Sequence, residues 1–205
     1  MSCYHNRILP WIHDKSLSGH DLDEIRLRVC GGLTGAVVEV GFGSGLNLRH
    51  YPSTVTQLHA VEPSVVARRM SEKRVSASPI PVSFDGDDGQ HLPYADASMN
   101  NAVITWSLCS IPDPAAAAGE LFRVLIRGGT VEFVEHGASP DPGVRRWQQR
   151  LNGINQRLSG CRLDRVAPRI LADAGFTVDN RSEYYLEKAP RWSGYMYEGT
   201  ATKAG

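Results

Sequence analysis

The chain has 205 residues, 41% hydrophobic and 21% charged, and its 22 basic side chains balance 22 acidic ones for a formal net charge of zero at pH 7. This length suits one domain with a sizeable core, so we predict a single domain over residues 1–205. The zero net charge argues against a nucleic-acid substrate. No apolar run approaches the ~20 residues of a membrane span, and the start of the chain lacks a signal-peptide pattern, so we expect a cytoplasmic protein.

Residues 1–31 precede the first predicted strand and include a helix predicted over 18–31. Their first half mixes aromatic side chains and histidines unusually densely, with Tyr4, Trp11 and His13 among them. One interpretation is an apolar cap packed on the core.

A strand predicted over 35–40 is followed by three alternate glycines, Gly41, Gly43 and Gly45, with Glu39 two residues ahead. Valines on both faces of this strand predict burial in a parallel sheet. Glycine lets the backbone turn sharply and approach a ligand closely. A helix predicted over 44–50 would direct free amides at an anion. This pattern is typical of S-adenosylmethionine sites: the amides would meet the methionine carboxylate, and Glu39 would accept hydrogen bonds from the ammonium group.

A nicotinamide or flavin site is the main alternative, because Gly-x-Gly-x-x-Gly with an acid about 20 residues on marks such sites. Counted from Gly41, that pattern requires a glycine at position 46, where the chain has Leu46. The Glu39 carboxylate would also repel a pyrophosphate, whereas it attracts an ammonium group. The sequence therefore disfavours an oxidoreductase.

The second predicted strand, over 56–61, ends at Glu62 and Pro63 and leads into a helix predicted over 63–75. An acid at the carboxyl end of a strand, at this distance from the glycines, is placed to bind the two hydroxyl groups of a ribose. The alternative is a solvated loop carboxylate.

A third strand, predicted over 80–84, leads into a polar turn that contains Asp87, Asp88, Gly89 and Gln90. Asp88 could accept a hydrogen bond from an adenine amino group, and the amide of Gly89 or Gln90 could donate to the ring. Asp87 would take the first role if the register slips by one residue.

The fourth strand is predicted over 101–106 and the next helix over 113–126, where Asp113 and Pro114 are typical of an N-cap and a first turn. Cys109 lies between them. The four cysteines are widely separated and form no Cys-x-x-Cys pair, so we predict neither a zinc site nor a redox dithiol. We expect most of them to be reduced and buried as small hydrophobes. Cys109 either packs in the core or lines a substrate pocket.

The remaining strands are predicted over 129–135, 176–181 and 195–201, and the remaining helices over 143–158 and 163–174. Alternating strands and helices predict a parallel sheet covered on both faces. Trp147 belongs to an apolar stripe in the helix over 143–158, which core packing explains unaided. His136, at the end of the fifth strand, is either structural or part of a site.

The chain resembles the class I S-adenosylmethionine-dependent methyltransferases over about positions 37 to 201. Within them it is similar to the branch that includes ubiquinone-biosynthesis enzymes and mammalian thiol S-methyltransferases. Three segments carry the similarity to the thiol-methylating relatives: residues 106–111, residues 133–136, and residues 147–149 followed by Gly160 and Cys161.

The resemblance implies a Rossmann-like α/β fold with a mainly parallel seven-stranded sheet and a reversed last strand. It also implies that residues 1–31 form a helical lid over the methyl acceptor, outside a core over 35–201, with the segment 143–160 as a second lid candidate. Methyl transfer to a small molecule would follow.

The predicted site residues comprise a cofactor-binding group, a substrate-binding group and one candidate base. The predicted cofactor-binding residues are Glu39, Gly41, Phe42, Gly43, Gly45, Asn47, Glu62, Pro63, Asp87, Asp88, Gly89, Gln90 and Trp106. The predicted substrate-binding residues are Tyr4, Trp11, His13, Cys109 and Trp147. His136 is the candidate base or positioning group, and no metal is expected.

Methyl transfer from a sulfonium depends mainly on holding nucleophile, methyl and sulfur in line. A thiol acceptor must also lose a proton to react well. We predict an S-adenosylmethionine-dependent methyltransferase, a monomer or weak dimer, acting on a small molecule and foremost on a thiol or hydrogen sulfide. The alternatives are a small apolar O-, N- or C-acceptor such as a phenol or quinone precursor, and a cofactor-binding protein without catalysis.

Overall fold

The computed structural model describes residues 3–205, which contain one seven-stranded sheet. The strands are β1 (Gly35–Val40), β2 (Val55–Val61), β3 (Val82–Gly86), β4 (Met99–Thr105), β5 (Leu125–His136), β6 (Phe176–Tyr185) and β7 (Tyr195–Lys203). Their spatial order is β3-β2-β1-β4-β5-β7-β6. β7 pairs antiparallel with both neighbours, and the other pairs are parallel. The predicted Rossmann-like fold with a reversed last strand is therefore confirmed.

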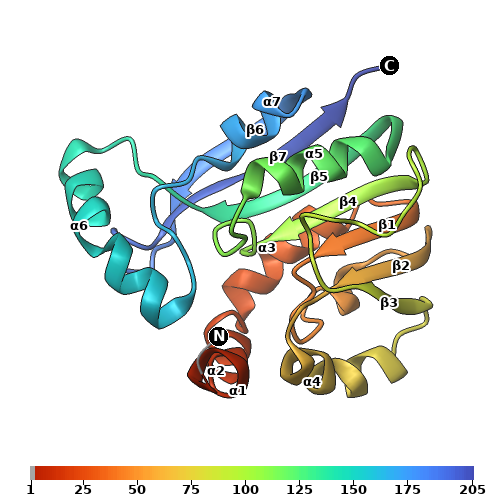
Figure 1. Cartoon of the computed structure of the whole chain (residues 1–205), viewed down its shortest axis with the longest axis horizontal. Coiled ribbons are helices and arrows are strands. Elements are labelled where there is room, and N and C mark those ends of the chain that lie inside the picture. The colour runs from red at the N-terminus through yellow and green to blue at the C-terminus, as the bar shows by residue number, and fades with distance from the viewer. Residues whose placement is uncertain (1–2) are drawn as a thin grey trace.

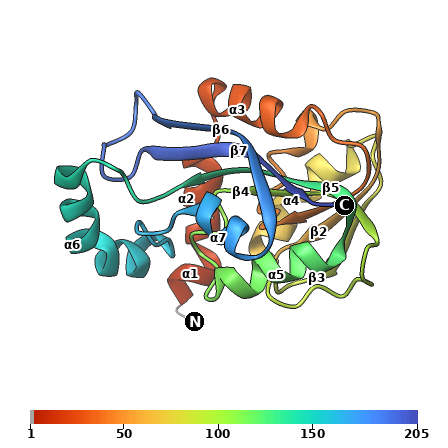
Figure 2. The ribbon, with the colours of Figure 1, turned by 90° about the horizontal axis from the view of Figure 1, so that it is seen from above.

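Helices cover both faces of the sheet (Figures 1 and 2). They are α1 (Cys3–Arg7), α2 (Leu9–Ser16), α3 (His20–Cys30), α4 (Val65–Ser76), α5 (Pro114–Val124), α6 (Pro142–Ser159) and α7 (Ala167–Asp173), with a short 3-10 helix over Leu48–His50. Seen from above, α3 lies on one side of the sheet and α5 and α7 on the other (Figure 2). In residues 3–205 no helix is both long enough and apolar enough to cross a membrane.

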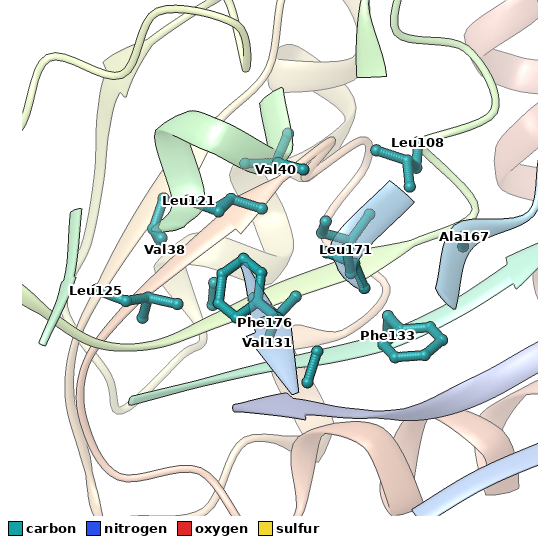
Figure 3. Packing of buried hydrophobic residues seen from close by; sticks show 14 of the residues in the cluster. Val38, Val40, Leu108, Leu121, Leu125, Val131, Phe133, Ala167, Leu171 and Phe176 are labelled. Atoms are coloured by element: carbon teal, nitrogen blue, oxygen red, sulfur yellow. The ribbon is translucent and has the colours of Figure 1, made fainter. Parts of the chain in front are cut away.

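The core forms two clusters, one on each face of the sheet. In β1, Val38 and Val40 pack with residues of α5 and α7, including Leu121 and Leu171 (Figure 3). Val37, between them in sequence, packs on the opposite face with α3. Successive side chains of a strand point to opposite faces, so the continuous valine run follows from burial on both sides.

The predicted helix over 44–50 is wrong. Gly41, Gly43 and Gly45 have φ values of 82°, 58° and 79°, in the left-handed region. Alternate residues in that region cannot continue a right-handed helix. The loop therefore runs as turns, and only Leu48–His50 forms a 3-10 helix.

Three further boundaries differ from the prediction by four residues each. The last helix begins at Ala167 instead of residue 163, β5 begins at Leu125 instead of residue 129, and β6 ends at Tyr185 instead of residue 181. Other predictions held: the Asp113 carboxylate caps α5 by accepting hydrogen bonds from the amides of Ala115 and Ala116 at 3.0 and 3.1 Å.

Two parts of the chain lie beyond the carboxyl ends of the parallel strands. They are α6 on one side and the α1–α2 pair on the other (Figure 1). Gly160, at the end of α6, has a φ of 75°, and a side chain there would come within 3.7 Å of Leu9 in α2. In doubly wound sheets, ligands bind at this edge.

Candidate functional site

A hydrogen bond joins the glycine loop after β1 to Glu62, the acid after β2. Glu62 is 7% exposed, and its carboxylate accepts hydrogen bonds from the amides of Gly43 and Ser64, each at 2.7 Å. Burial raises the pKa of Glu62, although these two amides oppose the change. Each carboxylate oxygen has a second lone pair, so Glu62 can still accept hydrogen bonds from a ligand.

The three motif glycines meet different surroundings. A Cβ on Gly41 would lie 2.3 Å from that of Ser107, so glycine is required there by the close approach of the β4 loop. A Cβ on Gly45 would press on Phe42 and Leu48 at 3.1 Å. A Cβ on Gly43 would have no neighbour nearer than a backbone oxygen at 4.0 Å. The space beside Gly43 is therefore open.

Glu39 does not face open space, because only 1% of it is exposed. One carboxylate oxygen accepts from Asn47 Nδ2 at 2.8 Å and the other from the Tyr51 hydroxyl at 2.7 Å. Burial raises the pKa of Glu39 to about 7. Asn47 also donates to the Thr105 hydroxyl at 3.0 Å, which leaves its Oδ1 buried without a hydrogen-bond partner in the described residues.

The turn after β3 is organised by Asp88. Its Oδ1 accepts from both the backbone and the side-chain nitrogen of Gln90 at 2.9 Å, and these bonds lower the pKa of Asp88 to about 2. Gly89 is buried, and a Cβ there would lie 2.6 Å from Val40 Cγ1, so this turn packs on the end of β1. Asp87 is exposed.

Two further predicted cofactor residues lie at the same sheet edge. Phe42 is buried and packs edge-to-face on Phe84, with ring centroids 5.3 Å apart. Pro63 is exposed beside Glu62.

A cavity of about 200 Å³ opens next to this edge, at the ends of β4 and β5. It is lined by His13, Ser16, Leu17, Trp106, His136, Asn155, Ser159, Cys161, Leu163 and Ser193. The predicted residues Trp106, His13 and His136 are thus brought together from three distant parts of the chain. Trp106 has a φ of 49°, which is unusual for a bulky residue and marks a constrained position at the end of β4.

The other predicted substrate residues lie outside the set that lines this cavity. Trp11 and Trp147 are 60% and 57% exposed. Tyr4 lies in α1, where its ring packs edge-to-face on His5. Cys109 is buried behind the cavity wall.

Cys161 is the main cavity residue that sequence reasoning did not assign to the site. One donor atom from each of Cys109, His136 and Cys161 lies within 4.8 Å of the other two. Burial opposes the protonation of His136, but the neighbouring Cys161 sulfur and Glu135 outweigh it and raise the pKa of His136. The only sequence signal for Cys161 was its place in a segment shared with thiol-methylating relatives.

Glu135 holds the loop after β4 in place. Its buried carboxylate accepts hydrogen bonds from the amides of Ser107, Leu108 and Cys109 at 2.6, 2.8 and 3.3 Å. Burial raises the pKa of Glu135, and these amides oppose the change. The acid in the fifth strand therefore shapes the cavity wall rather than facing the cavity.

Comparisons with known proteins agree with this arrangement. Residues 38–133 match the family model described as a methyltransferase domain. The chain is 32% identical over 171 residues to the human thiol S-methyltransferase TMT1B, covering 78% of this chain and 67% of the relative. It is 28% identical over 109 residues to the ubiquinone/menaquinone biosynthesis C-methyltransferase UbiE of Rhizobium leguminosarum bv. trifolii, covering 53% of this chain and 40% of that protein.

Among solved structures, geranyl diphosphate methyltransferase in complex with S-adenosylmethionine superposes with a TM-score of 0.72 at 16% identity, covering 88% of this chain and 84% of that one. At that identity the likeness shows the fold alone. The fold and the glycine loop define a class I methyltransferase architecture. With the sequence matches, the chain belongs to the S-adenosylmethionine-dependent methyltransferases. It spans about two thirds or less of the thiol S-methyltransferases it matches.

Proposed function

We propose that the protein transfers the methyl group of S-adenosylmethionine to a small thiol or to hydrogen sulfide. The observation that carries this proposal is the cavity at the ends of β4 and β5, which has room for a small molecule and a wall containing His136 and Cys161. The 32% sequence identity to a human thiol S-methyltransferase supports a thiol as the acceptor.

The cofactor would lie along the carboxyl ends of β1, β2 and β3. In this arrangement Glu62 binds the ribose hydroxyls, and Asp88 with the Gly89 and Gln90 amides binds the adenine. The methionine moiety occupies the open space beside Gly43. Glu39 is only 1% exposed, compared with 7% for Glu62, so Glu39 acts mainly by orienting Asn47.

Asn47 Oδ1 is the atom we assign to the cofactor's ammonium group. Asn47 Nδ2 donates to Glu39 and Thr105, so the amide orientation is defined and Oδ1 needs a donor. A buried polar atom without a partner is unfavourable. An ammonium group supplies three N–H donors.

The acceptor would enter the cavity between α2 and the end of α6, with residues 1–31 acting as part of a lid. In this proposal residues 1–205 form a single domain that encloses the bound acceptor. A thiolate there would be attracted by the sulfonium of the cofactor, and alignment could supply roughly 7–11 kcal/mol of the barrier reduction. His136 lines the cavity where it can bind or position the acceptor sulfur.

A small apolar acceptor such as a phenol or quinone precursor is the second candidate. Trp106 offers an aromatic wall, and the Arg26 guanidinium lies over its ring with the guanidinium carbon 4.6 Å from the ring centroid. The similarity to a quinone-pathway C-methyltransferase favours the same class.

We also propose a cytoplasmic monomer or weak dimer without a nucleic-acid partner. Cys30, Cys109 and Cys161 are free thiols, which suits a reducing compartment. The zero net charge offers no electrostatic attraction to a phosphate backbone.

Methyl transfer can be measured with cofactor labelled in its methyl group, against a panel of thiols, sulfide, phenols, quinone precursors and amines. We expect turnover with thiols or sulfide that rises with pH as the acceptor ionises. Methylation of a phenol or quinone precursor alone would replace the thiol proposal with the second candidate. Tight cofactor binding by calorimetry with no turnover on any acceptor would identify a binding protein without catalysis.

A further inference from the structure

Two thiols and an imidazole meet at the cavity wall, and each comes from a different segment. Cys109 lies in the loop after β4, His136 ends β5, and Cys161 lies in the loop after α6. One donor atom of each lies within 4.8 Å of the others. His136 and Cys161 line the cavity, and Cys109 is buried behind them.

Apart from one another and the imidazole, the two sulfur atoms have only uncharged oxygen partners in the described residues. Cys109 Sγ lies 3.7 Å from the Trp106 carbonyl oxygen and 3.6 Å from the Ser110 hydroxyl. Cys161 Sγ lies 3.5 Å from the Ser159 carbonyl oxygen and 3.2 Å from the same hydroxyl. His136 Nδ1 is buried and has no hydrogen-bond partner among the described residues. An unpaired buried nitrogen in a native site requires an explanation.

Surrounding hydrogen bonds fix the loops that carry both cysteines. The Arg162 amide donates to the Cys109 carbonyl oxygen at 3.0 Å, which ties the two loops together. Asn155 Nδ2 donates to the Cys161 carbonyl oxygen at 2.8 Å. Glu135 holds the amide of Cys109, as described above. Such supporting contacts orient ligand residues in metal sites.

We propose that Cys109, His136 and Cys161 bind one zinc ion, with a fourth coordination position open to the cavity. Thiolate and imidazole donors suit zinc, and three protein ligands with one open position are typical of catalytic zinc. Around a tetrahedral ion with ordinary Zn–S and Zn–N bonds, donor atoms lie roughly 3.5–3.8 Å apart. To bind the ion, the three donor atoms would therefore need to approach one another by only about 1 Å.

The open position would present the acceptor. A thiol binding there would lose its proton to solvent at a lower pH than the free thiol, because the ion would stabilise the thiolate. Its sulfur then forms a bond to the methyl carbon as the carbon–sulfur bond of the sulfonium breaks. The products are a neutral thioether, which leaves the zinc, and S-adenosylhomocysteine. This step rests on the proposed thiol acceptor, whereas the metal site does not.

Metal content tests the site without reference to activity. The full chain is purified under a non-chelating reductant and its zinc measured by mass spectrometry. The metal is then removed, and zinc alone is titrated back against a chromophoric chelator. We expect one zinc ion per chain, and in a parallel cobalt(II) titration the charge-transfer absorption of thiolate ligands.

Three variants and a matched control locate the metal. Cys109→Ser, Cys161→Ser and His136→Ala should each weaken zinc binding by more than about 100-fold, since loss of a supporting contact alone gives 10–100-fold. Cys30→Ser replaces a buried cysteine outside the cluster and should retain one zinc ion. Thermal unfolding and cofactor affinity, measured on every variant, separate loss of a ligand from loss of the fold.

Three results would overturn the zinc site. They are reduced protein that binds neither zinc nor cobalt, a Cys109–Cys161 disulfide as the only chemistry of the pair, and zinc binding unchanged in the Cys109→Ser and Cys161→Ser variants. Failure of the thiol proposal is separate, because it would leave zinc bound while no thiol is methylated.

Discussion

At the scale of single residues, Glu62 connects the glycine loop to the proposed ribose site. Glu62→Ala should weaken S-adenosylmethionine binding by roughly 1.5–3 kcal/mol, the contribution of a charge-assisted hydrogen bond, which is about 10- to 150-fold in affinity. Calorimetric titration of the cofactor checks this. Glu72→Ala, at an exposed position in α4, is the control and should bind normally. Equal affinities for both variants would remove Glu62 from the site.

Gly43 provides a second residue-scale prediction, because a side chain there would enter the open space assigned to the cofactor. Gly43→Val should weaken cofactor binding by more than about 150-fold, a larger effect than that of Glu62→Ala.

Gly128→Val is the matched control for this change. Gly128 also has a left-handed φ, 75°, and a Cβ there would meet nothing within 4 Å. It lies near the start of β5, at the opposite end of that strand from the cavity. Both variants strain the backbone alike, so similar cofactor affinities in the two would show that the space beside Gly43 is not the binding site.

At the scale of elements, α5 depends on its N-cap. Asp113→Ala removes the acceptor for the amides of Ala115 and Ala116, so it should destabilise the protein by about 1 kcal/mol. Asp113→Asn keeps a capping oxygen, so this variant should lose little stability. Urea unfolding of both variants measures the difference. Identical stabilities for the alanine and asparagine variants would show that the cap contributes nothing.

At the scale of the whole molecule, burial of Glu39 couples stability to pH. Its carboxyl has an ordinary pKa of 4.5 in the unfolded chain but a pKa of about 7 in the native protein. Between these values the native protein holds a proton that the unfolded chain has lost. Stability of the cofactor-free protein should therefore fall as pH rises through this window, by up to about 3 kcal/mol from this group.

Glu39→Gln tests that coupling, because the amide cannot ionise. Its unfolding free energy, measured by urea denaturation from about pH 5 to about pH 8, should fall less steeply than that of the unmodified protein. Glu72→Gln, exposed in α4, should keep the original slope. A slope unchanged by Glu39→Gln would mean that Glu39 is already ionised in the native protein across this range.

The sequence by itself determined the features that depend on neighbouring residues. The valine run of β1 shows burial on both faces, Asp113 and Pro114 mark the start of α5, and Gly41 with Gly45 marks the loop after β1. Local sterics and strand periodicity produce each of these patterns. The same reasoning failed over 44–50, because the sequence did not show that each glycine adopts a left-handed φ.

Only the tertiary structure decided which distant side chains share a site. It buried Glu39 against Asn47 and Tyr51, left Trp11 and Trp147 exposed, and gathered Cys109, His136 and Cys161. The cysteine spacing along the chain predicted no metal, because ligand patterns recognised from sequence require residues close together in one segment. In the folded protein the ends of β4 and β5 lie side by side, and the loop after α6 packs against them. Contacts between segments that are remote in sequence therefore form the cluster.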